Sequence, residues 1–224
     1  MKLRNVVLII VLIIVVDQTL KIWIKTTYPF GHVKDVMGLK WFKLYFIENE
    51  GMAWGWKFGG EWGKMILTLF RLGAVIFGTW YLVKIVKNNY HRGFIICAAL
   101  IYAGALGNLI DSMFYGLIFS SSDYSTVATM FSHGHGYAGF LHGRVVDMLY
   151  FPLIRSTFPG WVPVWGGESF EFFSPIFNIA DASISTGVIV LLLFQKRFFK
   201  KHHPGENHPV GETSTKVNDE MQIS

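Results

Sequence analysis

The sequence is short of charge. Only 16% of its 224 residues are Asp, Glu, Lys or Arg, whereas a soluble domain usually carries about 25%. Apolar residues make up 52% of the chain and the mean hydropathy is +0.39. These residues come in long blocks rather than at amphipathic spacing, which argues against a soluble domain. The composition indicates an integral membrane protein.

Several functional classes lack their usual signals. The single cysteine, Cys97, excludes an internal disulfide and is expected to be a small buried hydrophobe. Neither HExxH nor GxSxG occurs. His133, His135 and His142 lie on a Gly-rich stretch with poor ligand spacing, so we expect no metal or other cofactor. The net charge of +5 comes from basic residues beside apolar blocks, which indicates membrane anchoring and no nucleic-acid partner.

Four apolar blocks are long enough to cross a bilayer, which takes about 20 residues. They are approximately residues 5–24, 65–86, 93–114 and 176–194. No small-residue cleavage site follows the first block, so we interpret it as an uncleaved span rather than a signal peptide. Residues 1–200 are predicted to form one integral-membrane domain, and the polar tail 201–224 is expected to be disordered.

The positions of the basic residues predict which side each end occupies. An even number of spans puts both termini on one side, and the tail and the link between spans two and three are basic, which places both termini in the cytoplasm. The six lysines of segment 25–64 argue against this orientation. Within the outer segments, alternating aromatics predict short strands in 25–63, and the Gly-rich, Ser-rich 115–175 is expected to be an irregular cap.

Ionisable residues inside spans are expensive, and usually face a bundle interior or a wet cavity. Asp17 and Lys21 are four residues apart on one helical face, where mutual neutralisation by an ion pair is the simpler explanation. Asn108 and Asp111 lie near the outer end of span three, where they also fit a hydrogen-bonded clamp between helices. Both pairs are nevertheless candidate site residues.

Two further acids are predicted to meet at the same membrane face. Asp147 lies in the apolar "GRVVDMLYF", and Asp181 follows Asn178 at the start of span four. Burial would raise the pKa of Asp147, although a surface pair with Arg144 is an alternative. Two such acids that share a proton can hydrolyse an amide without a metal or a covalent intermediate. A small ion- or proton-coupled carrier and a non-catalytic membrane scaffold are the competing functions.

Five motifs in this order over four spans resemble the lipoprotein signal peptidase (signal peptidase II) family: "DQTLK", "ENEGMAWG", "GALGNLIDS", "GRVVDM" and "FNIADASI". The resemblance implies a bacterial inner-membrane aspartyl endopeptidase with its active site on the periplasmic side. It would remove the signal peptide from a diacylglyceryl-modified prolipoprotein, cleaving on the N-terminal side of the lipobox cysteine, and would be sensitive to globomycin-type inhibitors.

The same resemblance assigns the site residues and the outer elements. It implies a catalytic dyad of Asp147 and Asp181, and a periplasmic β-cradle over about 40–58. Substrate contact or support of the dyad is implied for Asp17, Lys21, Asn49, Gly51, Asn108, Asp111 and Asn178.

Two departures from the family pattern stand out. The family usually has Arg directly after Asn-x-x-Asp, where this chain has Ser112, and the segment 119–142 looks inserted. We hypothesise that Arg144 supplies the missing guanidinium, so that Arg144→Ala would reduce turnover.

Overall fold

The computed structural model describes residues 1–49, 60–131, 136–152, 154–161, 163–172 and 175–199. Four helices are long and apolar enough to cross a membrane, which confirms the four predicted spans with shifted ends. They are α1 (Leu3–Thr27), α2 (Gly60–Lys87), α3 (Arg92–Ile110) and α5 (Ile179–Phe198). α3 continues directly into a π-helical turn, η2 (Asp111–Tyr115), and a short α4 (Gly116–Ile118). The predicted tail 201–224 lies outside the described residues.

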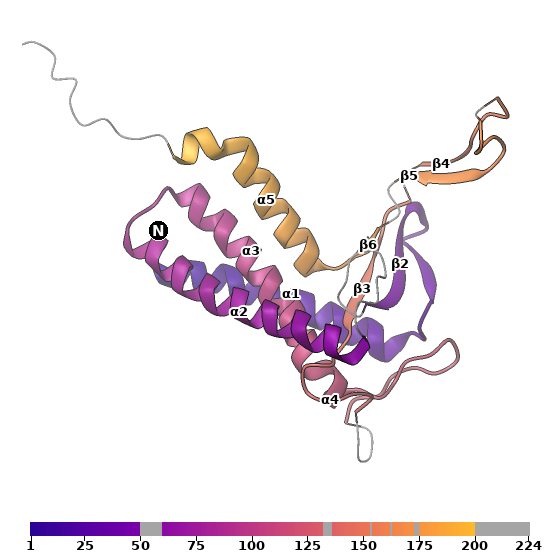
Figure 1. The fold of residues 1–224 in the computed structure, drawn as a ribbon, viewed down its shortest axis with the longest axis horizontal. Coiled ribbons are helices and arrows are strands. Elements are labelled where there is room, and N and C mark those ends of the chain that lie inside the picture. The colour runs from indigo at the N-terminus through magenta and orange to yellow at the C-terminus, as the bar shows by residue number, and fades with distance from the viewer. Residues whose placement is uncertain (50–59, 132–135, 153, 162, 173–174, 200–224) are drawn as a thin grey trace, which may run out of the picture.

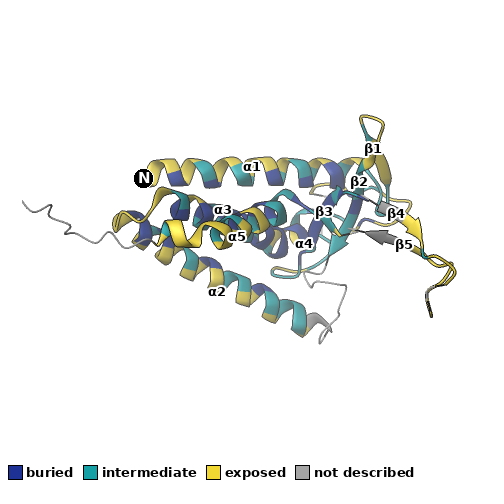
Figure 2. Cartoon of the chain, turned by 90° about the horizontal axis from the view of Figure 1, so that it is seen from above, coloured by how far each residue is buried: buried dark blue, intermediate teal, exposed yellow. Residues whose placement is uncertain are grey.

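α3 is the central helix and contacts α1, α2 and α5. The strands gather at one end of the bundle (Figure 1). Large apolar side chains on the outer helix faces are open, as Leu12 (65% exposed), Phe70 (73%) and Leu193 (72%) show (Figure 2). Such extensive apolar exposure is rare on soluble monomers, and it fits a surface that faces lipid.

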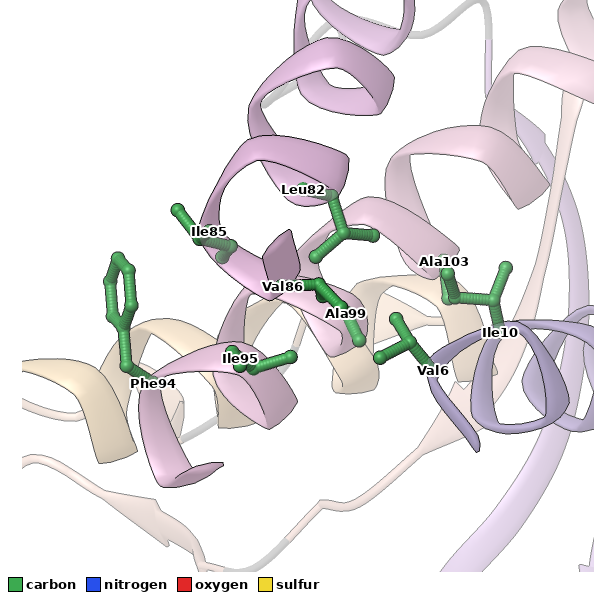
Figure 3. Packing of buried hydrophobic residues seen from close by; sticks show 9 residues of the cluster. All are labelled: Val6, Ile10, Leu82, Ile85, Val86, Phe94, Ile95, Ala99 and Ala103. Atoms are coloured by element: carbon green, nitrogen blue, oxygen red, sulfur yellow. The ribbon is translucent and has the colours of Figure 1, made fainter. Parts of the chain in front are cut away.

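Away from the strands, the bundle is held by an apolar cluster between α1, α2 and α3 (Figure 3). Its buried members are Val6, Ile10, Leu82, Ile85, Val86, Phe94, Ile95, Ala99 and Ala103. All of them are aliphatic or aromatic, and none is ionisable. Ionisable groups are instead buried near the end that carries the strands, which separates a packed apolar half from a polar half.

Helices α3 and α5 approach each other through small residues. A Cβ at Gly104 would lie 2.2 Å from the Ala180 carbonyl oxygen, and one at Gly187 would lie 2.8 Å from the Cys97 carbonyl oxygen. Small residues allow such close packing of membrane helices. The position of α5 against α3 therefore depends on the missing side chain at Gly104.

We expect Gly104→Ala to lower the melting temperature of the detergent-solubilised protein, because the new methyl group meets backbone that cannot yield. Overpacking of this kind costs about 1–3 kcal/mol. Gly73→Ala, on α2, is the matched control: a Cβ there meets no atom within 4 Å, and alanine favours a helix. Equal melting temperatures for the two variants would contradict this account of the packing.

The main sheet has four antiparallel strands in the order β1-β2-β3-β6. They are β1 (Val33–Val36), β2 (Leu39–Asn49), β3 (Val145–Tyr150) and β6 (Ile176–Phe177), and a separate hairpin pairs β4 (Ile154–Thr157) with β5 (Ser169–Phe172). β1 and β2 confirm the predicted strands in 25–63. The part of the expected cradle beyond Asn49, up to residue 58, lies outside the described residues.

The expectation of an irregular cap over 115–175 is wrong for its second half, where β3, β4 and β5 lie. The reason is the sequence "VVDMLY": five of its six residues are buried. Val146 and Met148 pack on one face against Ile24 of α1 and Tyr115 of η2, and Val145 and Asp147 on the opposite face are buried as well. A strand with covered faces loses the alternation that marks a half-exposed one.

The segment 119–142 is tied to the rest of the protein on several sides. Its Asp123 carbonyl accepts from the Phe30 backbone N–H at 2.9 Å, and its Leu141 carbonyl accepts from the Thr68 hydroxyl on α2 at 3.0 Å. Phe119 and Ala128 belong to a second buried cluster, with Ile24, Phe46, Tyr115, Val146 and Met148. The described part of this segment therefore braces α1, α2 and the sheet.

Candidate active site

The start of α5 positions the first acid. Asn178 caps the helix: its side-chain oxygen accepts from the Asp181 N–H at 2.8 Å, and Oδ2 of Asp181 accepts from the Asn178 N–H at 3.3 Å. This reciprocal capping box fixes both side chains. Strand β6 runs directly into the cap, and its Phe177 is paired with Leu149 of β3. The helix start is therefore held beside β3.

The second acid, Asp147, lies in the middle of β3 and is 3% exposed. The Asn178 side-chain amide donates to Asp147 Oδ1 at 2.7 Å, and Asn49 makes a further side-chain hydrogen bond to Asp147. Asn49 can reach because β2 pairs Ile47 with Asp147 and Asn49 with Val145. Asn49 and Asp147 are thus diagonal neighbours on one face of the sheet.

Asp147 and Asp181 are brought together, as the sequence led us to expect. Asp181 Oδ1 accepts from the Asn108 side-chain amide at 2.7 Å, and Asn108 Oδ1 accepts from the Asn178 side-chain amide at 3.2 Å. Each acid therefore accepts a hydrogen bond from a side-chain amide, and the two amides are hydrogen-bonded to each other. The acids are close enough to interact electrostatically.

Burial is the main cause that raises the pKa of Asp147, to about 7, and the neighbouring Asp181 carboxylate raises it further. Lys21 and the hydrogen bonds from Asn178 and Asn49 act in the opposite direction. Near neutrality Asp147 is therefore able to hold or release a proton, which an ordinary aspartate is not.

A buried lysine supports the site from α1. The Lys21 ammonium, fully buried, contacts Asp17 Oδ2 at 2.9 Å, Asp111 Oδ2 at 2.8 Å and Asn108 Oδ1 at 2.9 Å. All three of its protons thus have an acceptor. The predicted Asp17–Lys21 pair is present, but it is part of a larger network, because Asp17 Oδ1 also accepts from the Ala180 N–H of α5 at 2.9 Å.

Gln18 is a member of this network that the sequence reasoning missed. Its amide donates to Asp111 Oδ1 at 2.8 Å, and its carbonyl oxygen accepts from the Tyr115 hydroxyl at 3.1 Å. It lies inside the motif "DQTLK", so a signal was present. A polar side chain next to a buried acid in a span needs a partner of its own.

The π-helical turn η2 lies near the C-terminal end of span three. Three of its residues, Asp111, Ser112 and Tyr115, are buried, and their i, i+1 and i+4 spacing puts them on one face. π turns are rare, and they often occur at functional sites. The turn faces β3, whose Val146 N–H donates to Asp111 Oδ2 at 3.4 Å.

The guanidinium beside Ser112 belongs to Arg71, not to Arg144. Nη1 of Arg71, on α2, donates to the Ser112 hydroxyl at 3.0 Å. Arg144 instead pairs with Glu48 Oε2 at 3.3 Å, and it lies over the Tyr137 ring. The hypothesis that Arg144 replaces the missing guanidinium is therefore wrong, because Glu48 holds its side chain at another cluster.

That other cluster centres on Lys25, which is fully buried at the end of α1. Its ammonium pairs with Glu48 and donates to the Ser122 hydroxyl at 3.0 Å. Three rings surround it: those of Phe46, Phe119 and Tyr137. The cluster joins α1, β2 and the segment 119–142 and holds the sheet over the bundle.

The remaining predicted positions are Gly51 and three histidines. Gly51, His133 and His135 lie outside the described residues. His142 bonds locally, through Nδ1 to the Phe140 carbonyl at 2.8 Å.

Comparison with known proteins gives the family. Residues 9–197 match the family model described as Signal peptidase (SPase) II. A lipoprotein signal peptidase of Porphyromonas gingivalis is 50% identical over 190 residues, which cover 84% of this chain and 81% of that protein. A lipoprotein signal peptidase of Amoebophilus asiaticus is 35% identical over 189 residues, with coverages of 83% and 75%.

Two solved structures, both described as a bacterial membrane enzyme structure obtained by the in meso method, share the fold. The first, at 2.3 Å resolution, has a TM-score of 0.53 and 24% identity, and covers 96% of each chain. The second, at 1.9 Å, has a TM-score of 0.52 and 26% identity, and covers 86% of this chain and 93% of the other. With the match over most of its length, the chain belongs to the signal peptidase II family.

Proposed function

We propose that the protein is an aspartyl endopeptidase that removes signal peptides from prolipoproteins, cleaving before the diacylglyceryl-modified cysteine. The observation that carries the proposal is the pair of acids: Asp147 and Asp181 interact at the strand-bearing end of the bundle, each held by a side-chain amide. Family membership makes a prolipoprotein the natural substrate. A buried pair of carboxyls can share one proton, which is what acid–base hydrolysis of an amide requires.

The roles of the two acids follow from their surroundings. Asp147, with its raised pKa, holds the shared proton and hydrogen-bonds the scissile carbonyl oxygen. Asp181, which is less buried, is the base that takes a proton from the attacking water. As the water oxygen bonds to the carbonyl carbon, Asp147 gives its proton to the carbonyl oxygen. When the C–N bond breaks, the leaving nitrogen receives the proton from Asp181, and Asp147 regains its own as the carbonyl reforms.

The membrane setting suits this substrate. The signal helix and the acyl chains are apolar, while the scissile bond must meet two acids. The exposed apolar faces of the four spans suit the signal helix and the acyl chains, and the polar site near one end suits the scissile bond. We place the protein in the bacterial inner membrane with the sheet on the periplasmic side and both termini in the cytoplasm. The same site is the expected target of globomycin-type inhibitors.

A cleavage assay tests the proposal. Purified protein in detergent should cut a lipobox peptide with a diacylglyceryl cysteine on the N-terminal side of that cysteine, as mass spectrometry of the products would reveal. The unmodified peptide should be cut far more slowly. A carrier or a scaffold would yield no products from either peptide.

The pH dependence gives a second test. Asp147 carries its proton below about pH 7 and loses it above, so kcat/KM should fall as the pH rises through about 7. The Asn49 hydrogen bond favours the ionised form of Asp147. Asn49→Ala should therefore move this basic limb to higher pH, by about one unit for a bond to a charged group.

Lys43→Gln on the same strand is the control, because Lys43 pairs with Asp35 at 2.8 Å rather than with the site. Its basic limb should coincide with that of the unmodified protein. A basic limb unmoved, or moved to lower pH, by Asn49→Ala would show that Asp147 is not the group that titrates.

A further inference from the structure

Arg71 is a cation in the middle of the span α2, and it lies in none of the five motifs. An ionisable residue there usually has a functional partner, and the sequence analysis did not single it out. Its Nη1 donates to the Ser112 hydroxyl at 3.0 Å, and that hydroxyl donates to the Asn108 backbone carbonyl at 3.0 Å. The Asn108 side chain in turn donates to Asp181 at 2.7 Å. Arg71 is thus linked to Asp181 through two residues of span three.

The charges around the site make Arg71 important to the acids. Among the described residues, the titratable and charged groups that face the site are Asp17 and Lys21 on α1, Arg71 on α2, Asp111 on η2, Asp147 on β3 and Asp181 on α5. Lys21 makes its ion pairs with Asp17 and Asp111. Arg71 interacts electrostatically with Asp181 most strongly, then with Asp111 and Asp147. Glu48 belongs to the separate cluster with Lys25 and Arg144.

We propose that Arg71 is a positioning residue that orients Asp181 through Ser112 and Asn108 and stabilises the negative charge of the dyad. The inference rests on the proposed function. It also fits the departure at Ser112, where the family usually has arginine: here Arg71 brings a guanidinium to Ser112 from α2. A positive charge near a carboxylate favours its ionised form, more strongly where little water screens the pair.

Removing this charge should change the acidic limb of the pH–rate profile. In Arg71→Gln, the ionised dyad loses a favourable interaction, so protonation should silence the enzyme at higher pH than before. An opposite charge at about 4–6 Å accounts for about 1–3 pH units, and for Arg71, which is linked to Asp181 through Ser112 and Asn108, we expect a shift of about one. At the low-pH edge kcat/KM would fall about tenfold or more, mostly in kcat. Arg71→Lys keeps the charge and should keep the limb near its original place.

Thr68→Val is the matched structural control. Thr68 lies on the same helix, is 2% exposed, and donates to the carbonyls of Lys64 and Leu141. Its loss should weaken the docking of α2 and lower the melting temperature, while the acidic limb stays in place. If Arg71→Gln acted only by loosening helix packing, it would also lower the melting temperature and leave the acidic limb in place, as Thr68→Val does.

Moving the guanidinium back to span three is the decisive variant. Arg71→Ser combined with Ser112→Arg exchanges the two side chains across one contact, and it should restore the acidic limb that Arg71→Gln displaces. If Arg71→Gln yields no folded protein, the exchanged variant decides alone: a limb at the original pH supports the proposal, and a folded variant with a displaced limb or no turnover overturns it.

The proposal fails if folded Arg71→Gln has the acidic limb of the unmodified protein, whatever its overall rate or stability. That result is distinct from failure of the proposed function, in which the unmodified protein itself does not cleave the diacylglyceryl peptide.

Discussion

Asp147→Asn and Asp181→Asn are each expected to abolish cleavage of a diacylglyceryl lipobox peptide, with a loss of at least about a thousandfold in single-turnover rate. Each change keeps the shape of the side chain but removes the carboxyl that transfers a proton, and such transfer contributes about 10²–10⁴-fold. The surrounding amides can stay as they are, because the new Asn keeps one side-chain oxygen that can accept from Asn178 at position 147 or from Asn108 at position 181.

Binding separates loss of chemistry from loss of the site. Both variants should still bind the uncleaved peptide with an affinity within a few-fold of the original. Asp35→Asn is the control, since Asp35 is an exposed partner of Lys43 on the sheet and should retain full activity. Turnover above about a tenth of the original rate in either dyad variant would contradict the two-acid mechanism.

Lys21→Met should have the largest effect on folding. The Lys21 ammonium is fully buried between Asp17, Asp111 and Asn108. Removing one partner of a buried ion pair costs about 3–5 kcal/mol, because the remaining charges lose their compensation. We therefore expect a much lower melting temperature in detergent, with most of the protein aggregated.

A second change should relieve part of this effect. Adding Asp111→Asn to Lys21→Met removes one of the two stranded carboxylates and should recover part of the lost melting temperature. Lys43→Met is the comparison, because its pair with Asp35 is partly exposed and such pairs contribute only about 0–1 kcal/mol. If Lys21→Met were no more destabilising than Lys43→Met, the buried network would not stabilise the fold.

The spans and the two acids could be predicted because their signals are local. Long apolar blocks define a span by length alone, and an acid that interrupts apolar sequence, as Asp147 and Asp181 do, is conspicuous. The order of the five motifs along the chain then indicates which two acids form the proposed dyad. The same reasoning identified Asp17, Lys21, Asn108 and Asp111, which meet in one network.

The partners of these residues could not be predicted, because they depend on which helix faces which. Arg144 was close in sequence to Asp147 but pairs with Glu48 on β2, while Arg71 reaches Ser112 from another helix. Mid-span Arg71 was a readable signal that was overlooked. The strand β3 was missed because residues on both of its faces are buried, and a strand covered on both faces does not alternate in polarity.

The π turn at Asp111–Tyr115 sets a limit on how this stretch can vary in length. A π turn closes its hydrogen bonds one residue farther along the chain than an α-helical turn, so it takes up one extra residue locally. Gly116, which follows the turn, packs against Ala138 and Gly139. Deletion of one residue within the turn can close it to a regular helix and leave this contact in place. A second inserted residue would rotate everything that follows by about 100°, so insertions are the length changes that this part of the chain tolerates least.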